Sequence, residues 1–240
     1  MSVELIRERY LQTLERIAKA ARRAGRDPDQ VQLIVVTKAQ PLEVVQAAIQ
    51  AGARYLGENY PEEGAMKIQS LAEAKQVEWH MIGHLQRRKA DLVIRHFDFF
   101  HALDSLRLAQ RLSRLAQEAG RSLPTLLEFN LGGEESKFGW PAWDEAAWPT
   151  LWPEIEAVLS LPGLNVQGVM AMPPLAENPE NSRPYFRQLR RLQETLAKRF
   201  PQVEWKHLSM GTSADYEVAV EEGATMVRVG QAILGPRPTK

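Results

Sequence analysis

The stretch Leu33–Ile34–Val35–Val36–Thr37–Lys38 decides the fold of this chain. Five aliphatic or β-branched residues follow one another without a polar alternation, which is typical of a strand covered on both faces. The lysine stands where such a strand opens into a cleft. Partial desolvation there lowers the pKa of an amine and makes it more nucleophilic, as Schiff-base chemistry requires, although most lysines at strand ends are simply solvated. The rest of the sequence has to decide between these two interpretations.

The chain repeats a pattern of strand followed by helix. An amphipathic helix over 2–24 closes at Gly25 and precedes the first strand, over 32–38. Seven further strands are predicted, at 54–58, 77–83, 98–104, 124–130, 166–172, 203–210 and 225–230. The predicted helices between them run from Pro41 to Gly52, over 62–74, 86–96 and 105–120 (capped by Ser105), through a tryptophan-rich stretch to 161, and over 182–200 and 213–222.

Strict alternation of strands and helices requires right-handed crossovers and a parallel sheet. Eight repeats within 240 residues predict a closed (β/α)8 TIM barrel that forms a single domain over 1–240. Little chain follows the last strand, so we expect the extra N-terminal helix to fill the vacant position in the outer ring. An open, doubly wound sheet is the alternative, because short apolar runs are ambiguous by periodicity.

Composition narrows the class of protein. Apolar residues make up 44% and charged residues 25% of the chain, as in ordinary globular proteins. Basic and acidic residues number 30 each, so no basic field favours a nucleic acid or an anionic membrane as partner. The absence of cysteine excludes disulfides, thiolate nucleophiles and cysteine-based zinc sites. The charged N-terminus is unlike a signal peptide and no apolar run is long enough to span a membrane, so we expect a cytoplasmic protein.

In a TIM barrel the working face is formed by the C-terminal ends of the strands. Lys38 falls there, and so does the stretch 209–213 (Ser–Met–Gly–Thr–Ser) after the seventh strand. Loops after strands seven and eight often bind phosphate through backbone N–H groups, and Gly230 gives a second point of close approach. Taken alone, 209–213 is a loop that caps a helix. Together with a lysine at the same mouth, it predicts a site for pyridoxal 5′-phosphate (PLP).

Arg228 alternates with Val227 and Val229, so it faces the opposite side of its strand. If the valines pack toward the helices, the guanidinium points into the barrel mouth. Beside the ring nitrogen of PLP it would disfavour protonation of the ring, which makes the cofactor a poorer electron sink. The alternative is a structural salt bridge with a carboxylate of the barrel.

Motifs along nearly the whole chain carry a family resemblance. They are Val36–Lys38, Gly57–Tyr60, Trp79–Gly83 with Leu85, Gln86 and Lys89, Asn130 with Glu134, Ser136, Lys137 and Gly139, Gly168–Ala171, Leu208–Gly211 with Ser213 and Asp215, Met226–Gly230, and Ile233–Gly235. In these motifs the chain resembles the pyridoxal phosphate homeostasis proteins, single-domain relatives of the alanine racemase N-terminal barrel. Arg88 and Thr212 depart from the pattern, in which asparagine and methionine are common at these positions.

The resemblance implies a PLP-binding protein of intracellular PLP homeostasis that affects the balance of amino and keto acids. It implies that Lys38 is the Schiff-base lysine and that Arg228 faces the ring nitrogen. The other cofactor-binding residues it implies are Asn59 and Met172 at the ring and Ser209, Gly211, Thr212 and Gly230 at the phosphate. PLP-dependent apoenzymes are the expected recipients, and we expect a monomer.

Two other functions stay open. Racemases of this fold carry a second, all-β domain with a catalytic tyrosine, whereas here the barrel takes up the sequence to about residue 235. Tyr60 and Tyr216 are candidate substitutes, although positions in the packing or at the rim explain them as well. The alternatives are a PLP-dependent enzyme with weak racemase activity and a PLP-free barrel enzyme acting on a phosphorylated metabolite.

Three remaining features have ordinary interpretations. His80 and His84 have the i, i+4 spacing of a metal pair on a helix, but they fall on a strand that ends at Gly83, so no metal site is expected. The tryptophans at 140, 143, 148 and 152 are expected to pack in the outer ring rather than to stack on nucleic-acid bases. The proline-rich stretch 173–184 is expected to be a loop over the mouth, with the position of a lid.

Overall fold

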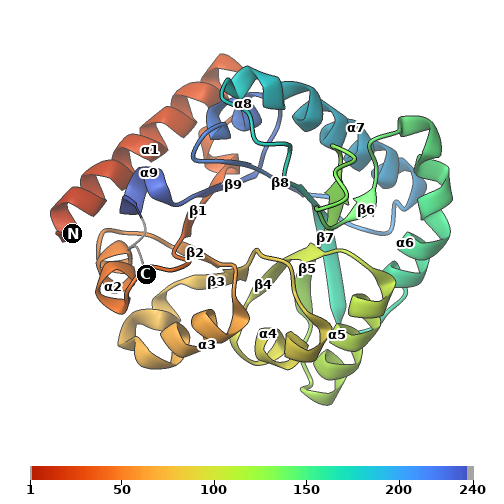
Figure 1. The fold of residues 1–240 in the computed structure, drawn as a ribbon, viewed down its shortest axis with the longest axis horizontal. Helices are drawn as coiled ribbons and strands as arrows, with labels where there is room; N and C mark the ends of the chain where they lie inside the picture. Colours follow the sequence, from red (N-terminus) through yellow and green to blue (C-terminus); the bar gives the residue numbers. More distant parts are fainter. Residues whose placement is uncertain (1, 237–240) are drawn as a thin grey trace.

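The computed structural model describes residues 2–236. These residues form a closed barrel of parallel strands inside a ring of helices (Figure 1). The strands pair in the order β1–β2–β3–β4–β5–β7–β8–β9, and β9 pairs with β1 to close the ring. The two-residue strand β6 pairs with β5 and adds a ninth strand to the sheet. The predicted (β/α)8 TIM barrel is therefore confirmed.

Each predicted strand has a counterpart in the structure. The strands are β1 (Gln32–Val36), β2 (Tyr55–Glu58), β3 (Glu78–Met81), β4 (Phe99–Leu103), β5 (Leu123–Asn130), β6 (Trp140–Pro141), β7 (Leu164–Ala171), β8 (His207–Thr212) and β9 (Met226–Val229). The helices are α1 (Val3–Arg23), α2 (Leu42–Gln50), α3 (Pro61–Ser70), α4 (Ala90–His96), α5 (Leu106–Glu118), α6 (Trp152–Leu159), α7 (Arg183–Arg199), α8 (Tyr216–Glu221) and α9 (Gln231–Leu234). Short 3₁₀ helices lie at Pro28–Gln30, Ala72–Gln76, Arg87–Lys89, Glu145–Leu151 and Pro179–Ser182.

Two local predictions were wrong. The seventh barrel strand, β8, starts at His207 rather than at 203, because the apolar residues before it belong to a turn at the end of α7. There the indole Nε1 of Trp205 donates to the carbonyl of Phe200 at 3.0 Å. Ser105 stands at the N-cap position of α5, but its hydroxyl donates to Asp104, and the amide of Leu106 donates to Oε1 of Glu154 at 3.0 Å instead.

The N-terminal helix fills the vacant position in the outer ring, as predicted. In Figure 1, α1 runs along α8 and the short α9, which is the only helix that the described residues contain after β9. Arg16 pairs with Glu217 at 2.5 Å and Arg23 pairs with Glu221 at 2.7 Å across this contact. Residues 237–240 of the predicted C-terminal tail lie outside the described residues.

The tryptophan-rich stretch packs in the outer ring, with one exception. Trp140 and Trp148 are buried, and Trp152 lies edge-on to Phe200. Trp143 is 52% exposed. Among the helices of residues 2–236, none has the length and apolar character needed to cross a membrane.

The close packing of α3 on the barrel gives a first prediction. A glycine in a helix is usually improved by alanine, by about 1 kcal/mol. At Gly64, however, an added Cβ would lie 2.4 Å from Cζ of the buried Phe97. We expect Gly64→Ala to lower the free energy of unfolding by about 1–3 kcal/mol in urea titrations. Met66→Ala, on the exposed side of the same helix, should stay within about 0.5 kcal/mol of the parent protein; a stabilised Gly64→Ala protein would contradict the packing.

Candidate functional site

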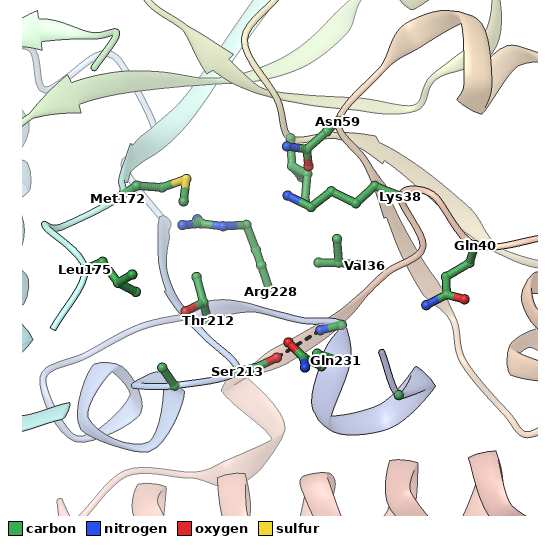
Figure 2. Close-up of a pocket in the computed structure, with 14 residues that line it drawn as sticks. Val36, Lys38, Gln40, Asn59, Met172, Leu175, Thr212, Ser213, Arg228 and Gln231 are labelled. Atoms are coloured by element: carbon green, nitrogen blue, oxygen red, sulfur yellow. Dashed lines mark hydrogen bonds between the residues drawn. The ribbon is translucent and has the colours of Figure 1, made fainter. Parts of the chain in front are cut away.

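A cavity of about 330 Å³ opens at the C-terminal ends of the strands, a size within the usual range for small-molecule sites. Figure 2 shows Lys38 and Asn59 reaching into it from one side, Met172 from the other, and Arg228 between them, with Thr212 and Ser213 at its edge. Six of the predicted site residues line this cavity, namely Lys38, Asn59, Met172, Thr212, Arg228 and Gly230. The remaining lining residues are Val36, Gln40, Ile82, Leu175, Ser213, Ala214, Gln231 and Gly235.

The pairing of β1 with β9 brings the lysine and the last strand together. Ile34 is in register with Arg228, so Lys38 and Gly230 follow at the same end of two adjacent strands. A Cβ on Gly230 would lie 2.9 Å from the carbonyl oxygen of Val36. Glycine is therefore required at this position for the backbones to approach as closely as they do.

The loop after β8 is held by its own side chains. Oδ1 of Asp215 accepts from the amide of Thr212 at 2.7 Å and from its hydroxyl at 3.1 Å. Oγ of Ser213 accepts from the amide of Gly230 at 3.3 Å, which ties the loop to the end of β9. Ser213 and Ala214 line the cavity, and among residues 2–236 no acceptor is found for their amides. Unpaired backbone N–H groups at a cavity wall suit an anionic ligand such as a phosphate.

Arg228 forms the floor of the cavity. Arg228 is 4% exposed and its two flanking valines are buried, and its guanidinium points into the barrel as expected. Nη1 donates to Oγ of Ser209 at 2.5 Å and Nη2 donates to the carbonyl of Ala171 at 3.0 Å. Burial lowers the pKa of Arg228 to about 10, with the charges of Glu128 and Asp215 acting against it, so the side chain stays positively charged at neutral pH. Both hydrogen bonds found for Arg228 among the described residues go to neutral acceptors, which disfavours the structural salt bridge.

Two predicted phosphate residues lie behind the cavity wall. Ser209 is fully buried beneath Arg228, and its Oγ lies 2.9 Å from Nδ1 of His101. Gly211 has a φ of +91°, and an added Cβ would lie 2.6 Å from Cβ of Ala219, so this glycine lets the loop turn close to α8. Their positions support roles in holding Arg228 and in shaping the loop, respectively.

The two histidines at i, i+4 spacing belong to different networks. Nδ1 of His80 lies 2.8 Å from Nε2 of His101 inside the barrel. His84 contacts Asp104 at 2.8 Å and stacks on Phe138 at the rim. In the part of the chain that the structure describes, no three histidine, cysteine or acidic side chains come together as metal ligands.

Two features of the site escaped prediction. Glu128 interrupts the apolar run of β5, and its Oε2 has no hydrogen-bond partner among residues 2–236. The one sign of Glu128 in the sequence was that a charged residue interrupts an otherwise apolar strand. The buried Lys67 and Glu58 and the partly exposed Glu63 form a cluster that contacts the backbone on both sides of Lys38. Lysine and glutamate on a helix are normally solvated, so no local pattern distinguishes this cluster.

Comparisons with known proteins agree on one family. Residues 11–238 match the family described as "Alanine racemase, N-terminal domain". The "Pyridoxal phosphate homeostasis protein" of Aquifex aeolicus is 40% identical over 231 residues, which cover 96% of this chain and 97% of that protein. The protein of the same name from Escherichia coli is 39% identical, with 94% of each chain covered.

Solved structures similar to this chain include members of the same family. PipY of Synechococcus elongatus, in a structure with PLP bound, has a TM-score of 0.79 at 36% identity and covers 92% of this chain and 99% of its own. Alanine racemase of Clostridium difficile has a TM-score of 0.69 at 17% identity, with 59% of its own chain covered. At 17% identity, the similarity to alanine racemase is a similarity of fold alone.

The buried carboxyl of Glu128 gives a prediction about pH. Burial, reinforced by the charge of Asp104 and opposed by that of Arg228, raises the pKa of Glu128 from 4.5 to about 7. The folded protein therefore holds a proton that the unfolded chain loses, and ionisation destabilises the fold as the pH rises toward 7. We expect Glu128→Gln, which stays neutral, to gain stability relative to the parent protein between about pH 5 and about pH 8, by up to about 3 kcal/mol.

Urea unfolding of both proteins across this pH range measures the difference. Two histidines, His101 and His207, have pKa values lowered by burial and destabilise the fold at low pH instead, but they are present in both proteins. The exposed Glu135→Gln is the matched control. A difference between Glu128→Gln and the parent that is independent of pH would show that Glu128 is ionised in the fold throughout.

Proposed function

This chain belongs to the alanine racemase N-terminal domain family and to its pyridoxal phosphate homeostasis proteins, and from this premise we propose that it binds PLP in the cavity at the barrel mouth. We propose further that the cofactor is bound covalently through Lys38 and that the protein acts in PLP homeostasis, as its relatives' names state. One PLP-binding domain over 1–240 is part of this proposal.

The observation that carries the proposal is the placement of complementary groups around one cavity. The amine of Lys38 enters from the end of β1, and the unpaired amides of Ser213 and Ala214 belong to the loop after β8. An amine and an anion cradle on opposite walls fit an aldehyde that also carries a phosphate. The volume of about 330 Å³ accommodates a single ligand of this size.

The residues of the chain have distinct roles in this proposal. When bound, PLP supplies an aldehyde carbon for imine formation and a ring that withdraws electrons. Lys38 holds the cofactor covalently, while Thr212, Gly230 and the adjoining amides hold the phosphate. Asn59 and Met172 border the ring, and Arg228 lies at its nitrogen. The other phosphate residues, Ser209 and Gly211, act from behind the wall by holding Arg228 and the loop.

A racemase would need a second acid–base group at the cavity. The two candidate tyrosines do not line it. Tyr60 is 58% exposed at the rim, and Tyr216 is buried in α8. No observation therefore favours racemase activity over a role in binding and delivering the cofactor. Exchange of the Cα hydrogen of alanine for deuterium at enzymatic rates would contradict this conclusion.

The proposal also covers partners and location. We propose that PLP-dependent apoenzymes receive the cofactor, and that the protein is a cytoplasmic monomer. The open mouth supports delivery, because Met172 and Leu175, the latter 94% exposed, border the cavity on its solvent side. Sedimentation of the PLP-loaded protein tests the monomer.

The covalent attachment gives a prediction about Lys38. After incubation with PLP and reduction by borohydride, peptide mass mapping should find the cofactor on Lys38. Lys38→Ala should lose both the label and the visible absorbance of the bound cofactor, because the amine that forms the imine is gone. Lys19→Ala, on the exposed face of α1, should keep both.

Two outcomes would overturn parts of the proposal. A label on another lysine would move the site away from β1. A parent protein that stays colourless with added PLP would favour a barrel enzyme for a different phosphorylated metabolite.

A further inference from the structure

A buried charged cluster lies behind the turn that carries Lys38. Lys67 of α3 is 1% exposed, and its Nζ donates to the carbonyl of Thr37 at 2.7 Å, to Oε1 of Glu58 at 2.7 Å and to Oε1 of Glu63 at 2.6 Å. The three donors of its ammonium group are all used. Charged groups are costly to bury, and well-packed apolar residues often replace such a cluster without loss of stability. The cluster therefore calls for an explanation other than stability.

The cluster binds the backbone on both sides of Lys38. The carbonyl of Thr37 accepts from Lys67, and the hydroxyl of Thr37 donates to Glu58 at 2.6 Å. On the other side, the amide of Ala39 donates to Oε1 of Glu63 at 2.7 Å. Lys38 lies between these two anchored residues, and its side chain reaches into the cavity.

The turn at Lys38 has an unusual conformation. The amide of Gln40 donates to the carbonyl of Thr37 at 3.1 Å, so residues 37–40 form a β-turn with Lys38 and Ala39 at its centre. Ala39 has a φ of +56° and is the one residue other than glycine with positive φ among residues 2–236. Turns of this kind normally place glycine or asparagine at that position, because a Cβ disfavours the left-handed region. A specific contact is needed to hold alanine there.

We propose that Glu63, held in place by Lys67, is a positioning residue that fixes the turn at Ala39 and thereby aims the amine of Lys38 into the cavity. The hydrogen bond from the amide of Ala39 is available to Glu63 only while the turn keeps its left-handed residue. Without it, the turn relaxes and Lys38 leaves its orientation. The identity of the ligand rests on the proposed function, whereas the orientation of Lys38 is a property of the protein without cofactor.

A double-mutant cycle tests the proposal. Glu63→Ala should weaken the affinity for PLP by about tenfold, a loss equivalent to one hydrogen bond to a charged group. In the Ala39→Gly background, the same Glu63→Ala change should weaken it by less than about threefold, because glycine occupies the left-handed region without support. Glu63→Gln keeps an oxygen acceptor and should retain most of the affinity. The matched control is Glu62→Ala, whose carboxylate pairs with Lys89 and does not touch the turn.

A second measurement uses the protein without cofactor. The rate at which acetic anhydride labels Lys38, followed by peptide mass spectrometry across a pH series, reports the environment of its amine. We expect the pH profile of this rate to change in Glu63→Ala and to return toward the parent profile when Ala39→Gly is added. Urea unfolding of each variant separates this effect from loss of fold; Glu63 is partly exposed, so its replacement leaves no fully buried cavity.

The outcomes separate the two proposals. Unchanged labelling of Lys38 and additive losses in PLP affinity would overturn the positioning role and leave the cluster purely structural. If Glu63→Ala changes the labelling of Lys38 while the parent protein does not bind PLP, the positioning role is supported and the proposed function is overturned.

Discussion

The hydrogen-bonded ladder between β1 and β9 is the contact on which the site depends. It closes the barrel, and its register from Gln32–Met226 to Val35–Val229 sets the ends of the two strands side by side. Lys38 follows the first of these strands, while Arg228 and Gly230 belong to the end of the second. A slip of one residue would turn Arg228 away from the cavity, since successive side chains of a strand face opposite sides. Closure of the fold and assembly of the site are thus the same event.

Much of the fold could be predicted, because periodicity and glycine positions are local properties. The eight barrel strands and the placement of α1 followed from alternation alone. The start of β8 did not, because the apolar Val203 and Trp205 pack against the end of α7 instead of joining the sheet. β6 also escaped prediction: a two-residue strand exists only through its pairing with β5. In both cases the structure depends on a contact with another element, the end of α7 or β5, which hydrophobic periodicity does not specify.

Some features of the site could likewise be predicted from the sequence, and others could not. Position at strand ends predicted Lys38, and alternation predicted the direction of Arg228. The family resemblance implied a place for Ser209 at the phosphate, but no pattern in the sequence indicated that its hydroxyl contacts Arg228 and His101. The cluster around Lys67 could not be predicted either, because it also depends on contacts between elements. A lysine among glutamates on a helix is normal at a surface, and only the packing of α3 against β2 and against the turn after β1 buries it.

The charge at the floor of the cavity limits the chemistry that a bound cofactor performs there. Arg228 keeps its proton at neutral pH because burial lowers its pKa only to about 10, and its direct acceptors, Ser209 and the carbonyl of Ala171, are neutral. In the proposed complex, a ring nitrogen beside this guanidinium stays unprotonated, since a second positive charge at that distance is unfavourable. Such a ring withdraws electrons weakly. The same positive charge attracts the anionic phosphate ester, so the cavity favours binding of the cofactor over stabilisation of a carbanion. A site of this kind suits holding and releasing PLP better than turning over an amino acid.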